Sequence, residues 1–186
     1  MGDEELAAPG TLEAVRTFVN SRDLELGLEA FDTPHGLRDW LAGRDLLEPG
    51  ATVSAIHLRR AVALREGLRG LMLANATGDP PPAEALVAVR AAGRRAPLRV
   101  SAGPDGLALE PAGPGADAAL GRLLAIVVLA QADGTWARMK ACPGDDCRWA
   151  LYDRTRSRTR TWCAAAKCGA RARARSYRER RRAVGR

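Results

Sequence analysis

The four cysteines of this 186-residue chain form two pairs, Cys142 with Cys147 and Cys163 with Cys168. Each pair encloses four residues, and fifteen residues separate the two pairs. Two short-spaced pairs of thiolates can each hold one edge of a tetrahedral ion, which is the geometry of structural Zn²⁺ sites. Because four protein ligands leave no position for a catalytic water, the spacing predicts one structural zinc ion bound by all four cysteines.

Disulfides, inert buried thiols and an iron–sulfur cluster are the alternatives to zinc. The first residues of the chain are acidic and no apolar run follows them, which is unlike a secretory signal. We therefore expect a cytoplasmic protein, in which cysteines are more often metal ligands than bridged. Inert thiols do not usually form two equally spaced pairs. A cluster has the right number of ligands, but an isolated site in a small basic segment favours zinc.

The charge of the chain is divided unevenly along its length. Residues 148–186 hold fourteen Lys and Arg against two acids, a net charge of +12, whereas the whole chain carries +7. The remaining residues therefore have a net charge of −5. Such a division indicates two segments with different partners, of which the basic one is expected to bind a polyanion.

Nine arginines of the basic segment are the candidate nucleic-acid contacts. Residues 154–160 alternate arginine with Thr and Ser, which favours an extended loop. Cys168 is expected in the first turn of a helix that runs to about residue 182, where arginines recur at intervals of three and four and form a basic stripe. A loop and a basic helix held by zinc are typical of nucleic-acid binding. The predicted contacts are Arg154, Arg156, Arg158, Arg160, Arg171, Arg173, Arg175, Arg178 and Arg182.

Helical periodicity dominates the residues before the cysteines. Apolar residues recur with helical spacing, between capping and glycine signals, in five segments: about 11–20, 34–43, 52–76, 83–94 and 116–131. Between the last two helices, residues 98–100 and 107–109 flank a glycine-rich turn, which indicates one short β-hairpin. Residues 1–10 are polar and are expected to be disordered. The longest apolar run, residues 123–130, is too short to span a membrane.

The predicted fold class is mostly α, with some α+β character. A helical domain over residues 11–135 carries one short β-hairpin, and a small four-cysteine zinc module over residues 136–186 ends in a basic helix. We expect four arginines of the longest helix to lie mostly opposite its apolar face: Arg59, Arg60, Arg65 and Arg69. Three aromatic residues near the cysteines can stack on bases, but packing around the metal is favoured: Trp149, Tyr152 and Trp162.

The order of residues in the zinc module resembles the CGNR zinc finger. The resemblance rests on the two cysteine pairs, Tyr152-Asp153, Trp162-Cys163, Cys168-Gly169 and the basic helix with Tyr177-Arg178. That module usually follows an ABATE domain in bacterial proteins described as stress-induced transcriptional regulators. Two segments, residues 18–22 and 37–41, resemble the beginning of the ABATE domain. One departure is that Ala170 replaces the asparagine of the signature, which leaves the metal ligands intact but removes a side chain able to form hydrogen bonds.

These features favour a DNA-binding transcriptional regulator over an enzyme. No Ser-His-Asp set, phosphate-binding glycine loop or paired-carboxylate motif is present, and neither His35 nor His57 has metal-ligand spacing. The amino-terminal domain would receive a small-molecule or protein signal, and a homodimer is the usual arrangement for reading symmetric sites. Two other functions stay open: RNA binding, which the charge suits equally well, and redox or metal sensing through the thiolates.

Overall fold

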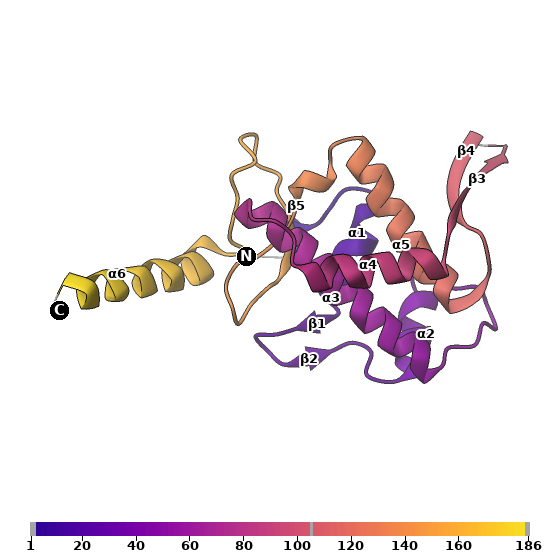
Figure 1. Ribbon diagram of the computed structural model, residues 1–186, viewed down its shortest axis with the longest axis horizontal. Helices are drawn as coiled ribbons and strands as arrows, with labels where there is room; N and C mark the ends of the chain where they lie inside the picture. Colours follow the sequence, from indigo (N-terminus) through magenta and orange to yellow (C-terminus); the bar gives the residue numbers. More distant parts are fainter. Residues whose placement is uncertain (1–2, 105, 185–186) are drawn as a thin grey trace.

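The computed structural model describes residues 3–104 and 106–184, which form a helical body from which one basic helix projects (Figure 1). In the part of the chain that the structure describes, five α-helices precede the cysteines, as the periodicity predicts. They are α1 (Leu12–Val19), α2 (Pro34–Ala42), α3 (Ala55–Thr77), α4 (Ala83–Arg95) and α5 (Gly115–Ala132). Thr33 caps α2 by accepting a hydrogen bond from Gly36 N at 3.0 Å, and Pro34 occupies the first turn.

The longest helix begins later than predicted. Its cap is Ser54, whose backbone N–H donates to His57 Nδ1 at 3.1 Å, so His57 has a structural role at the helix start. The expectation that its arginines lie opposite the apolar face is wrong for Arg65 and Arg69, which are buried. Both have carboxylate and other oxygen partners inside the body, and these partners replace the water that each guanidinium loses.

The core lies between α1, α3 and α5. One cluster of buried side chains joins these helices, and it includes Leu123 of α5, Val15 and Phe18 of α1, and Leu64 and Leu68 of α3. The α5 helix is long and apolar enough to cross a membrane, with a mean hydropathy of 1.5, but 56% of it is buried in the body. That burial is typical of the core helix of a soluble fold.

Across the described residues, three antiparallel two-stranded sheets accompany the helices. The predicted hairpin is β3 (Leu98–Gly103) with β4 (Gly106–Pro111), in the register Leu98 opposite Pro111, and it projects from the body beside α5 (Figure 1). The pairing of β1 (Arg22–Asp23) with β2 (Leu28–Glu29) was not predicted, because two residues are too few to show a pattern of alternation. Residues 148–153, with Trp149 and Leu151 on one side, are a strand candidate in the sequence, and β6 (Ala150–Tyr152) lies within them, but its pairing with β5 (Met139–Ala141) was not predicted.

The expectation of disorder over residues 1–10 is wrong for the residues that the structure describes. Asp3–Leu6 forms a 3₁₀ turn, η1, and Leu6 and Ala8 are buried. Ala8 N donates to Glu13 Oε2 at 2.7 Å, which fixes the segment on the start of α1. The segment also contacts the zinc module: Arg160 Nη1 lies 2.9 Å from Glu5 Oε1, and Arg154 Nε donates to Ala7 O at 3.1 Å.

The zinc module begins inside the core and ends outside it. A 3₁₀ turn, η2 (Trp136–Arg138), leads into the β5–β6 hairpin, whose Met139, Ala141, Ala150 and Tyr152 side chains belong to the main core. A π-helical turn, η3 (Ala165–Gly169), then continues as α6 (Ala170–Val184). Figure 1 shows α6 leaving the body on the side away from the β3–β4 hairpin, with the carboxy terminus at its far end.

Candidate metal centre and nucleic-acid interface

The four cysteines come together in the zinc module, as their spacing predicts. Their sulfur atoms all lie within 4.8 Å of one another, and Cys163 Sγ is 3.5 Å from both Cys147 Sγ and Cys168 Sγ. Cys142 follows β5, and its N–H donates to Trp149 O at 2.9 Å, so the hairpin fixes the first pair. The second pair is fixed by η3, where Cys168 N donates to Ala164 O at 2.9 Å.

The geometry and chemistry of the cluster fit one zinc ion. Zinc bound at about 2.3 Å by four sulfurs separates them by about 3.8 Å, close to the sulfur spacing seen here. Hydrogen bonds from Cys147 and Cys163 lower the pKa of Cys142 to about 2, and the contact with Cys142 raises the pKa of Cys147 to about 12. Contacts with these two thiols raise the pKa of Cys163 as well. Thiolates this close repel one another, and a divalent cation removes that repulsion.

Two of the three aromatic residues pack around the cluster. Trp149 and Trp162 lie against the cysteines, whereas Tyr152 belongs to the main core. Gly169 permits the close approach of Trp162, because a Cβ atom there would lie 3.2 Å from Trp162 Cδ1. Ala170 is half-buried at the first residue of α6, and nothing in the structure accounts for the missing asparagine side chain.

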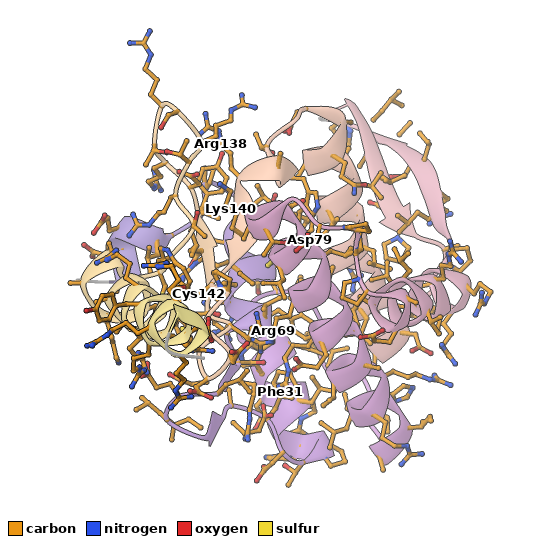
Figure 2. The ribbon with its side chains drawn as sticks, turned by 60° about the vertical axis from the view of Figure 1, so that its left-hand side comes forward. Phe31, Arg69, Asp79, Arg138, Lys140 and Cys142 are labelled. Atoms are coloured by element: carbon orange, nitrogen blue, oxygen red, sulfur yellow. The ribbon has the colours of Figure 1, made fainter. Side chains whose placement is uncertain are left out.

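A buried ion pair holds the arginine-rich loop of residues 154–160. The side chain of Lys140, which is labelled in Figure 2, donates from Nζ to Asp153 Oδ2 at 2.8 Å, to Arg158 O at 2.6 Å and to Arg160 O at 2.9 Å. Burial opposes the charge of Asp153, but hydrogen bonds from Lys140 and Thr155 lower its pKa overall. In the sequence, Asp153 stands out only as part of the resemblance to the CGNR zinc finger, and no pattern marks Lys140. Lys140 and Asp153 are thirteen residues apart, and a pair at this spacing forms no local pattern from which the ion pair could be predicted.

The nine predicted nucleic-acid contacts are not equivalent in the structure. Arg160 donates to Trp162 O at 3.3 Å and to Cys163 O at 3.1 Å, so it braces the metal centre from within the module. Arg154 donates to Ala7 O at 3.1 Å. In α6, Arg171 and Arg175 pair with Glu25 and Asp145, and Arg173 donates to Ala165 O at 3.5 Å.

The other four predicted arginines have exposed side chains without a hydrogen bond or ion pair to the described residues. They occupy two places, the tip of the 154–160 loop and the outer part of α6. Their guanidinium groups are therefore available to an external anion. These four residues are Arg156, Arg158, Arg178 and Arg182. Their role as nucleic-acid contacts stays a prediction.

Polar side chains of the amino-terminal domain bind the backbone of the zinc module. Asn20, which follows α1, accepts from Ala150 N at 2.7 Å and donates to Ala150 O at 2.9 Å, so it pairs with β6 as a strand would. Arg69 of α3, labelled in Figure 2, donates to Arg148 O at 2.9 Å and to Val19 O at 2.7 Å. The module is thus attached to the body by partly buried hydrogen bonds that the residue pattern did not predict.

We expect Asn20→Ala to lower the free energy of unfolding by about 1–3 kcal/mol, because both backbone groups of Ala150 lose their partner. Urea unfolding followed by tryptophan fluorescence measures this loss. The matched control is Gln131→Ala, which removes an exposed amide in the last turn of α5. Equal stability of the two variants would contradict a role for Asn20 in holding β6.

The fold and the thiol cluster together define a zinc-finger protein, in which a helical domain carries a four-cysteine module that ends in a basic helix. Residues 12–138 match the ABATE family, described as "Putative stress-induced transcription regulator", and residues 138–181 match the CGNR zinc finger. The chain therefore belongs to the ABATE family, and the resemblance seen in the sequence is confirmed. A comparison with curated proteins finds no match.

Proposed function

We propose that this regulator binds duplex DNA through the zinc module and that its α6 helix lies in the major groove. The observation that carries the proposal is the exposed course of α6, which leaves the body as a single helix with seven arginines and one acid. A helix of this kind has no apolar face to bury, and the major groove of B-DNA has the width of one α-helix.

The zinc module supplies a second basic element beside the helix. Arg156 and Arg158 lie in the 154–160 loop, which the Lys140 and Asp153 pair fixes relative to the metal centre. Arginines at the loop tip would neutralise phosphates and position the protein, whereas arginines of α6 would reach base edges. Zinc, when bound, holds the two elements together, because the cysteines come from both sides of the loop.

The amino-terminal domain is the proposed input of the regulator. Its helices would receive a small-molecule or protein signal, or join two copies of the chain into a homodimer, and none of its residues is proposed to be catalytic. We place the protein in the cytoplasm, where reduced cysteines keep a metal. RNA remains the competing polyanion, because phosphate neutralisation by arginine does not depend on the sugar.

The test is the affinity of zinc-loaded, full-length protein for duplex DNA and for structured RNA of equal length, at about 150 mM salt to screen weak phosphate contacts. We expect the wild type to bind the duplex more tightly than the RNA. We expect the double variant Arg178→Gln/Arg182→Gln to bind the duplex more weakly than the wild type, and the salt dependence of its affinity to be reduced by about one to two phosphate contacts.

The matched control for that double variant is Arg59→Gln/Arg90→Gln. It removes the same charge from exposed arginines of α3 and α4 in the amino-terminal domain. If both double variants lose affinity equally, net charge rather than α6 determines binding. Tighter binding to the RNA would replace DNA by RNA as the proposed partner.

A further inference from the structure

The turn between β1 and β2 reaches from the amino-terminal domain to the first turn of α6. Asp23 Oδ1 accepts hydrogen bonds from Glu25 N and Leu26 N, both at 2.9 Å, and this fixes the backbone at Glu25. The hairpin is in turn held to the body, because Arg69 of α3 donates to Arg22 O at 3.2 Å. Glu25 is therefore carried by the amino-terminal domain and not by the zinc module.

Each carboxylate oxygen of Glu25 binds one cation of the zinc module. Oε2 accepts from Lys167 Nζ and Oε1 from Arg171 Nη2, both at 2.8 Å. These hydrogen bonds lower the pKa of Glu25 and raise the pKa of Lys167 and of Arg171. The three side chains form one ion-paired group, which we name the acidic clasp.

The acidic clasp lies beside a cleft and is not part of a packed interface. Behind Glu25 the hairpin and the zinc module are separated by a pocket lined by Leu6, Trp149 and Ala164. The side chains of Lys167 and Arg171 keep 59% and 47% of their surface exposed. Opening the clasp therefore breaks ion pairs at the surface without uncovering a core, so its free-energy cost is small.

In the acidic clasp, Glu25 forms ion pairs with two cations at the start of the proposed DNA-binding helix. Arg171 is the first arginine of α6, and its Nη2 also lies 3.7 Å from Cys168 Sγ beside the metal centre. Asp145 pairs with Arg175 in a similar way, but it belongs to the zinc module itself and moves with it. Among the residues that the structure describes, Glu25 is the only acidic residue of the amino-terminal domain that forms an ion pair with α6.

We propose that Glu25 is an autoinhibitory anion, which competes with DNA phosphates for Lys167 and Arg171 and through which the amino-terminal domain sets the DNA affinity of the zinc module. This inference rests on the proposed function. A signal that moves the β1–β2 hairpin would free two cations at once, and both would then add to the phosphate contacts.

The test measures duplex-DNA affinity by fluorescence anisotropy at about 0.1 M salt, where exposed charges within about 10 Å still interact. The proteins are zinc-loaded and full-length. Because Glu25→Gln removes two exposed ion pairs, we expect it to bind about threefold to tenfold more tightly than the wild type. Glu25→Asp keeps the charge but shortens the side chain, so part of this gain is expected. The control Glu84→Gln, on the exposed start of α4, should change affinity less than about twofold.

A second background separates competition from simple repulsion between Glu25 and DNA. In Lys167→Ala/Arg171→Ala protein, Glu25→Gln should have no effect, because no cation remains to be released. A gain that persists there, or a Glu25→Gln affinity equal to that of the wild type, overturns the clasp while the proposed function stands. If neither the wild type nor Glu25→Gln binds duplex DNA, the clasp and the proposed function both fail.

Discussion

Removal of zinc is expected to unfold the outer part of the zinc module and to leave the helical body folded. The apolar contacts of the module outside the main core are few: three buried cysteines packed with Trp149, Trp162 and Cys163. Structural zinc contributes about 10–16 kcal/mol in isolated zinc fingers, far more than a core of this size can supply. The body keeps its own core between α1, α3 and α5.

The packing of the β5–β6 hairpin determines which residues of the zinc module should stay folded without zinc. Met139, Ala141, Ala150 and Tyr152 belong to the main core, and Asn20 binds the backbone of Ala150. We therefore expect amide protection to persist at residues 139–141 and 150–152 after chelation. Protection should disappear at residues 142–149 and 161–184, where the metal fixes the backbone. Hydrogen exchange with and without a chelator measures both results.

Two controls identify the metal as the cause. Added zinc should restore protection after chelation, whereas Cys142→Ser should lack protection at residues 161–184 even with zinc, because serine is a poor ligand for this ion. Full protection of α6 in the chelated protein would show that the helix needs no metal. Loss of protection throughout α1 and α3 would show that the two parts fold as one unit.

Local signals in the sequence predicted the metal ligands and the helices. Zinc ligation needs particular side chains at short spacings, so Cys142 and its three partners identify the site. The helices show their apolar period over nine to twenty-three residues, except α1, where eight residues sufficed because four of them are apolar and buried. The β3–β4 hairpin was marked by its glycine-rich turn.

Contacts between distant residues had no such signal. Asn20 and Ala150 are 130 residues apart, and an asparagine after a helix is equally typical of a cap. Arginine is the most ambiguous case, because its guanidinium group binds phosphates, carboxylates and backbone carbonyls. Arg69 and Arg160 both bind carbonyls within the fold, although the first was expected on an outer face and the second on DNA. The predicted domain boundary at residue 136 is not the limit of the main core, because the β5–β6 hairpin of the zinc module packs into that core.

Asp153→Ala is expected to lower the free energy of unfolding by about 3–5 kcal/mol, because removing one partner of a buried ion pair leaves the other charge uncompensated. Asp153 is fully buried, and besides Lys140 it accepts from Arg160 N at 2.9 Å and from Thr155 N at 2.9 Å. Because the pair lowers the pKa of Asp153, its contribution is present above the unfolded-state pKa of about 3.9 and is lost as the pH falls through the folded-state value. Urea unfolding of zinc-loaded protein at neutral pH therefore measures the full effect.

A second variant distinguishes an uncompensated charge from a simple loss of packing. In Asp153→Ala/Lys140→Met, the buried cation is replaced by an apolar side chain of similar length, so the double variant should be more stable than Asp153→Ala alone. Asp146→Ala, at an exposed position of the zinc module, is the matched control and should change stability by less than about 0.5 kcal/mol. If Asp153→Ala costs no more than this control, the ion pair does not hold the 154–160 loop. If the double variant is the less stable one, the buried cation is satisfied by the carbonyls of Arg158 and Arg160 alone.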